Sequence, residues 1–110
     1  MIQSLGKLLP TAGTPKRATE NLTTPDRTEK VHGVLIQALP SNTGKVYIGK
    51  QTLNKTTFAD VYAILPAASA GALPSFSAAI TCSPNGVNVN DFWIDVETGG
   101  DGVLVTVLVA

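Results

Sequence analysis

The sequence contains one cysteine, Cys82, and one histidine, His32. A single cysteine cannot form an intramolecular disulfide, which excludes the disulfide-stabilised folds of small secreted proteins. One histidine and one cysteine also cannot complete a closed zinc site within one chain. Because the two residues are far apart in the sequence and Cys82 falls in an expected core strand, they do not predict a nucleophile–base pair. We therefore expect a protein that is not an enzyme and that uses no metal or cofactor.

Charged residues are also scarce, at 15% of the chain against about 25% in a typical soluble domain. Eight basic residues balance eight acidic ones, so the chain lacks the basic surplus of a general nucleic-acid binder. Residues 1–60 carry all eight basic residues and four acidic ones, a net charge of +4, whereas residues 61–110 carry only four acidic ones. Low charge density and halves of opposite sign favour a subunit of a larger assembly.

Long hydrophobic runs are missing as well. No segment approaches the ~18 consecutive apolar residues of a transmembrane helix, so we expect no membrane partner. The apolar residues at the start of the chain are interrupted by Gly6 and Lys7, unlike the continuous apolar stretch of a signal peptide. We therefore expect neither an anchor nor a leader.

Residues 1–30 contain three prolines, many threonines and frequent charges, and so offer little apolar surface to a core. We predict that they form an extended N-terminal arm outside a domain of residues 31–110. The arm starts with an apolar cluster of interface candidates, namely Ile2, Leu5, Leu8 and Leu9. The last three share a helical face, so the cluster forms either one helical turn or a strand added to a neighbouring subunit.

Residues 31–110 are typical of short strands separated by turns. Residues 34–49 predict a hairpin around the turn at 40–44, and residues 91–109 predict a second hairpin around the glycine-rich turn at 98–102. Residues 58–65 favour a strand, with a helix over 57–64 as the alternative. Residues 76–82 alternate as a half-buried strand that is followed by a strong turn signal at 83–86.

About six strands without a long amphipathic helix predict an all-β fold, a small antiparallel β-sandwich or barrel. Trp93 falls on the polar face of its strand, where a tryptophan is a candidate interface anchor. The last strand is apolar on both faces, so it is either covered or packed against another subunit. Val105 and Val107 are therefore further interface candidates.

Acidic residues near the second predicted hairpin leave two alternatives open. Asp95 and Glu97 would have Cα atoms ~6.6 Å apart on one strand face, a separation that overlaps the carboxylate spacing of glycosidases. Together with Asp101 they could instead hold Ca²⁺, although the order of residues differs from that of an EF-hand loop. Neither pattern is specific enough to replace the prediction of a protein without catalytic or metal sites.

Two segments resemble small structural proteins of tailed bacteriophages. The first is Leu35–Gly49, an apolar strand followed by Ser-Asn-Thr-Gly and a Val-Tyr-Ile-Gly strand. The second is Asn90–Glu97 with Gly100–Val103, which is similar to the closing hairpin of the same group. The resemblance covers roughly residues 31–49 and 88–109, and it excludes the arm.

This resemblance implies a viral capsid decoration (cement) protein, which is made in the host cytoplasm and sits on the capsid exterior of the virion. The implied partners are the major capsid protein or other virion proteins, and the implied state is a homo-oligomer, a dimer or trimer. Two alternatives remain from other classes. One is another virion subunit of the neck, tail or fibre base, and the other is a carbohydrate- or receptor-binding β-sandwich, suggested by Trp93 and its flanking carboxylates.

Overall fold

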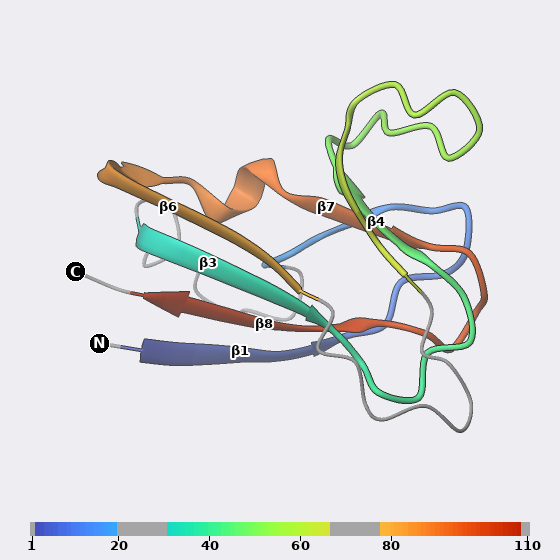
Figure 1. The fold of residues 1–110 in the computed structure, drawn as a ribbon, viewed down its shortest axis with the longest axis horizontal. Coiled ribbons are helices and arrows are strands. Elements are labelled where there is room, and N and C mark those ends of the chain that lie inside the picture. Colours follow the sequence, from blue (N-terminus) through green and yellow to red (C-terminus); the bar gives the residue numbers. More distant parts are fainter. Residues whose placement is uncertain (1, 20–30, 67–77, 109–110) are drawn as a thin grey trace.

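A computed structural model of the protein describes residues 2–19, 31–66 and 78–108. These residues form two four-stranded antiparallel sheets that pack as a small sandwich (Figure 1). The strand order is β1-β8-β3-β6 in the first sheet and β2-β7-β4-β5 in the second. The elements are β1 (Ile2–Leu8), β2 (Lys16–Arg17), β3 (Val31–Ala38), β4 (Val46–Gly49), β5 (Val61–Leu65), β6 (Ala78–Val87), the 3-10 turn η2 (Val89–Asp91), β7 (Trp93–Val96) and β8 (Val103–Leu108). The prediction of an all-β sandwich is confirmed.

The N-terminal segment differs from the prediction of an arm outside the domain. Strand β1 pairs along its length with β8, and β2 pairs with β7. The leucines at positions 5 and 8 are both buried in the core. Residues 2–19 are therefore part of the sandwich, while residues 20–30 lie outside the described residues. The added strand pairs with the chain's own β8 and not with a neighbouring subunit.

A β-bulge explains why the leucine spacing resembled a helix. The register of β1 against β8 steps from Ser4↔Thr106 to Gly6↔Val105, so Leu5 is an extra residue in β1. Gly6 has a φ of 80°, a conformation that glycine adopts without steric cost. The extra residue breaks the period of two, so Leu5 and Leu8 both point into the core although they are three positions apart.

Neither predicted hairpin forms. Strand β3 pairs with β6 and β8, whereas β4 pairs with β5 and β7 in the other sheet. Strands β7 and β8 are likewise divided between the two sheets. The segments 39–45 and 97–102 are therefore crossovers between sheets. Their turn residues were recognised correctly, but the chain does not return to the same sheet.

The two crossovers are bonded to each other through a set of buried groups that we call the crossover clasp, formed by Asn42, Asp101 and Gly102. The Asn42 amide donates to the Gly102 carbonyl (2.8 Å) and accepts from the Gly102 amide (2.9 Å). The Asp101 carboxylate accepts from the backbone amides of Thr43 (3.0 Å) and Gly44 (2.7 Å). Hydrogen bonds to a charged group each stabilise a fold by about 1.5–3 kcal/mol.

Strand β6 continues through the predicted turn at 83–86. Its pairing with β3 steps from Gly33↔Cys82 to Val31↔Val87, so the turn residues form a bulge, in which Gly86 has a φ of 94°. Of the two alternatives for residues 57–65, the strand is correct over Val61–Leu65. Among the described residues there is no helix with the length and apolar character needed to cross a membrane.

The core lies between the sheets and is made of aliphatic side chains. Its largest fully buried members include Ile36 from the first sheet and Ile48 and Ile94 from the second. Alternate residues of β8, namely Val103, Val105 and Val107, also face this core. The N-terminal strand adds Leu5 and Leu8, so it contributes to core packing as well as to the sheet.

Adjacent leucines provide a test of this role. Leu8 is 3% exposed, whereas Leu9 is 51% exposed. We expect Leu8→Ala to lower the free energy of unfolding by about 2–5 kcal/mol, because it leaves a core cavity. Leu9→Ala, the same change one position later, should cost much less, about 0.5 kcal/mol. Urea unfolding measures both, and equal effects would contradict the integration of β1 into the core.

Candidate functional site

The seven predicted interface residues divide into two groups. Four are buried in the chain's own core, namely Leu5, Leu8, Val105 and Val107. This burial corrects the prediction for Leu5, Leu8 and Val105, because their side chains pack within the core of the sandwich. Val107 also belongs to the core, but it lines the groove described next. Of the others, Ile2 is 76% and Leu9 51% exposed, and Trp93 is half-buried. Ile2 and Trp93 line two different surfaces, one on each sheet, whereas Leu9 lines neither of them.

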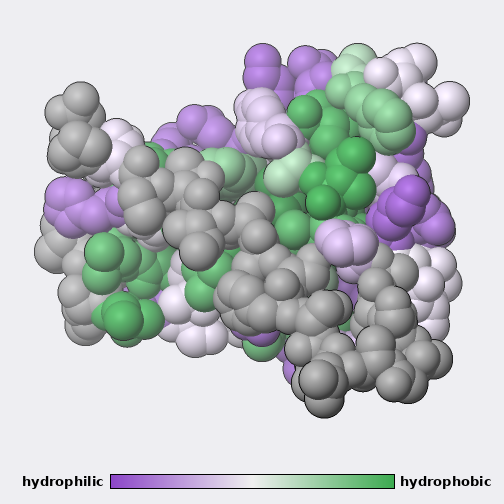
Figure 2. All heavy atoms as spheres, viewed as in Figure 1, coloured by the Kyte–Doolittle hydropathy of each residue, from purple (hydrophilic) through white to green (hydrophobic). Residues whose placement is uncertain are grey.

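The outer face of the first sheet carries an apolar groove of about 270 Å³. Its lining consists of Ile2, Gly33, Val34, Leu35, Thr106, Val107 and Leu108. Gly33 lies between Cys82 and Leu108 in the sheet, at the centre of three paired strands. Leu108 is 44% exposed. Apolar side chains gather at this end of the sheet, near both termini (Figures 1 and 2).

Trp93 lies on the outer face of the second sheet, because Ile94 and Val96 of the same strand face the core. Its cross-strand neighbour is Arg17, and the Arg17 guanidinium lies 5.8 Å from the centre of the indole ring. This is within the range of a cation–π interaction. The indole also borders a polar pocket of about 370 Å³, lined by Lys50, Gln51, Tyr62, Asn90, Asp91 and Trp93.

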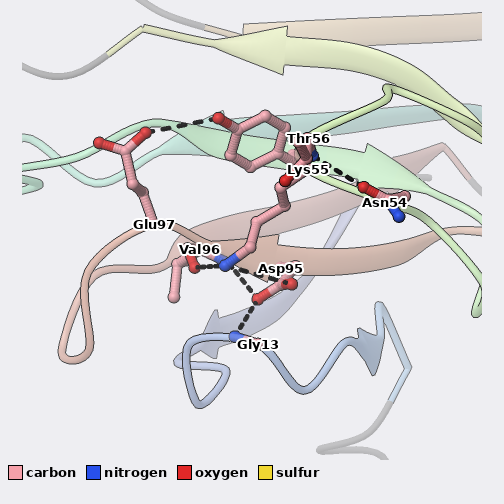
Figure 3. A network of polar contacts seen from close by, with 8 residues as sticks. Gly13, Asn54, Lys55, Thr56, Asp95, Val96 and Glu97 are labelled. Carbon is pink, nitrogen blue, oxygen red and sulfur yellow. Dashed lines mark hydrogen bonds and ion pairs between the residues drawn. The ribbon is translucent and has the colours of Figure 1, made fainter.

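Beside this pocket, a buried carboxylate fixes the outer surface of the second sheet (Figure 3). The Asp95 side chain is 3% exposed and lies 3.6 Å from the Lys55 ammonium group. It also accepts a hydrogen bond from the backbone amide of Gly13 (2.9 Å). The Lys55 ammonium donates to the Val96 carbonyl (3.0 Å). Asp95 therefore holds the turn near Gly13 and the loop around Lys55 against β7.

Tyr47 from β4 is buried, and its hydroxyl donates to the Glu97 carboxylate at 3.4 Å, a long and therefore weak hydrogen bond. Burial is the largest cause that raises the pKa of the Tyr47 hydroxyl above its ordinary 10.0. The Glu97 carboxylate, through its charge and its hydrogen bond, and the charge of Asp95 raise this pKa further.

The acidic residues considered as alternatives do not converge on one site. Asp101 is bonded to the amides of the crossover clasp, whereas Asp95 is bonded to Lys55 and Gly13. Among the described side chains, no cluster of three or more histidine, cysteine, aspartate and glutamate residues could hold a metal ion. His32 is exposed on β3. Asp95 and Asp101 therefore hold neighbouring backbone segments in place through hydrogen bonds from backbone amides.

Most of the polar pocket was missed by sequence reasoning. Lys50, Gln51, Tyr62 and Asn90 were not singled out, because they come from a loop, an edge strand and a 3-10 turn with no shared spacing. The sequence does contain one local signal for the turn that carries Asn90. Asn88 is the N-cap residue of η2, and its side-chain oxygen accepts a hydrogen bond from the backbone amide of Asn90. No protein-family model, curated protein or solved structure matches this chain.

The Asp95 contacts predict a graded loss of stability. Asp95→Ala removes a buried acceptor and leaves the Gly13 amide without it, so we expect the free energy of unfolding to fall by about 2–4 kcal/mol. Asp95→Asn keeps an acceptor oxygen and should lose less. The exposed Asp91→Ala is the control, expected to change stability by no more than about 0.5 kcal/mol. Urea unfolding would contradict this role of Asp95 if Asp95→Ala matched the control.

The Tyr47 environment predicts a dependence on alkaline pH. The folded state holds the Tyr47 hydroxyl proton more tightly than the unfolded chain does. The stability that comes from the protonated hydroxyl is therefore fully present below about pH 10 and is lost as the pH rises through the folded-state pKa. Stability should therefore fall less between about pH 8 and pH 11 in Tyr47→Phe, which has no proton to lose, than in the wild type. Urea unfolding at both pH values measures this, with Tyr62→Phe as the exposed control. An unchanged pH dependence in Tyr47→Phe would refute it.

Proposed function

We propose that this protein is a structural subunit that binds neighbouring protein subunits through the apolar groove of its first sheet. The observation that supports this is the groove itself, an outward-facing hollow between Ile2, Leu35 and Leu108. Full burial of one large aliphatic side chain contributes about 1.5–3 kcal/mol. Ile2 is 76% and Leu108 44% exposed, so a partner seated on them would remove much apolar surface from water.

Within this class, we propose a phage capsid decoration protein, on the basis of the resemblance of residues 31–49 and 88–109. The low charge density supports the same proposal, since few charges oppose close packing between subunits. The partner is then the major capsid protein or another copy of this chain, and the location is the virion exterior. The proposal invokes no catalysis, so it needs no catalytic residues.

Light scattering after size-exclusion chromatography, together with co-sedimentation, tests this proposal. We expect the full-length protein either to form a dimer or trimer or to pellet with empty shells of the capsid protein encoded in the same genome. Leu108→Ser should weaken that association about tenfold or more, since it removes apolar contact area. Phe58→Ser is the matched control, because Phe58 is 55% exposed but lies outside the groove lining.

The outcomes separate the alternatives. A protein that stays monomeric and does not sediment with shells would overturn the proposal. Rings or tubes of the purified protein in electron micrographs would favour a neck or tail subunit over a decoration protein. Equal weakening by Leu108→Ser and Phe58→Ser would show that association does not use the groove.

A further inference from the structure

We propose that the polar pocket on the second sheet binds a neutral saccharide. The pocket is lined by Lys50, Gln51, Tyr62, Asn90, Asp91 and Trp93, and its volume of about 370 Å³ is within the range of small-ligand sites, roughly 300–1,000 Å³. The saccharide site is distinct from the apolar groove, because none of its lining residues is shared with it. This function is therefore additional to the proposed assembly role.

Two aromatic rings form the apolar part of the pocket, and both are held in place by neighbours. The Tyr62 ring packs edge-to-face on Phe92, with ring centres 6.1 Å apart and an interplanar angle of 80°. Phe92 in turn packs against the core. The Trp93 indole is held by the Arg17 guanidinium. Aromatic faces of this kind stack on the C–H-rich faces of sugar rings, and their fixed orientation lowers the entropy cost of binding.

The remaining lining residues supply hydrogen-bonding groups. Asn90 is anchored through its side-chain oxygen, which accepts a hydrogen bond of 2.6 Å from the Thr19 hydroxyl. Its amide NH₂ group is then the donor that a ligand hydroxyl would use. Gln51 and Asp91 provide further donors and acceptors, and Asp91 is exposed. Amide and carboxylate groups next to aromatic rings match a ligand that is rich in hydroxyl groups.

The charge of the pocket favours a neutral ligand. Lys50 contributes one positive charge and Asp91 one negative charge, and the other four lining residues are uncharged. A phosphate or a uronic acid would meet the Asp91 carboxylate as well as the Lys50 ammonium group, so the lining residues carry no net positive charge for an anion. The Arg17 guanidinium lies against the Trp93 indole and is not part of the lining. A neutral pyranose, which needs hydroxyl partners on several sides, fits this balance better.

The position of Trp93 makes the test direct, because Trp93 is the only tryptophan in the chain and its fluorescence reports on the pocket. We would titrate the full-length protein with maltohexaose, cellohexaose and chitohexaose, with a hyaluronan hexasaccharide as the acidic comparison. The proposal expects a saturable change of Trp93 emission with at least one neutral oligosaccharide. Binding should weaken about tenfold or more in Tyr62→Ala and detectably in Asp91→Ala.

Controls distinguish this site from the assembly surface. Phe58→Ala removes an exposed aromatic ring outside the pocket lining and should bind like the wild type, as should the groove variant Leu108→Ser. Thermal unfolding confirms that each variant is folded, and the exposed Asp91→Ala provides a second test if Tyr62→Ala is unstable. No saturable response to any neutral oligosaccharide, stronger binding of the acidic one, or unchanged binding in both pocket variants would overturn the proposal.

Discussion

The architecture depends on the crossover clasp, the reciprocal hydrogen bonds of Asn42 with Gly102 and the amide contacts of Asp101. These groups join the connection from β3 to β4 with the connection from β7 to β8. Because each connection changes sheets, the clasp fixes both the spacing of the sheets and the position of their strands. Asp101 is 5% exposed, so its charge is stabilised by backbone amides and not by water.

The clasp also constrains the N-terminal strand. A side chain at Gly102 would collide with the Leu8 carbonyl, so the end of β1 lies directly against the crossover. This close approach requires glycine because no space remains for a Cβ atom. The core position of Leu8 and the hydrogen bonds of Gly102 are therefore coupled. The segment that composition marked as an arm therefore packs directly against this crossover.

Sequence periodicity predicted the positions of the strands better than it predicted which strands pair with each other. A strand period of two puts Val46 and Ile48 on one face of β4 and Ile94 and Val96 on one face of β7, and all four side chains are in the core. The turns at 40–44 and 98–102 were also located, but turn chemistry is local and does not specify the sheet that the chain enters next. Leu5 was misinterpreted because a bulge changes the strand period, and one extra residue leaves no distinct pattern in the sequence.

The candidate sites were less predictable than the fold, for a related reason. Trp93 was recognised because a large aromatic side chain on a polar face is unusual, but its neighbours Lys50 and Tyr62 reach it only through the pairing of β4 with both β5 and β7. The groove similarly depends on the pairing of Ile2 and Gly33 with Leu108, across three strands. Long-range pairing is the information that periodicity does not contain.

The outer faces of the two sheets differ in what covers them, and this difference suits them to different partners. On the second sheet, Asp95 and Lys55 hold loops against β7, and the surface that remains is a polar pocket with fixed rings. On the first sheet, the groove near both termini is apolar and exposes Ile2 and Leu108. An exposed apolar hollow favours burial by a protein partner, whereas the hydrogen-bonding side chains of the polar pocket match a ligand that carries hydroxyl groups. Because the two sites share no residues, association through the groove need not occupy the pocket, and a subunit attached by one sheet could still present the other.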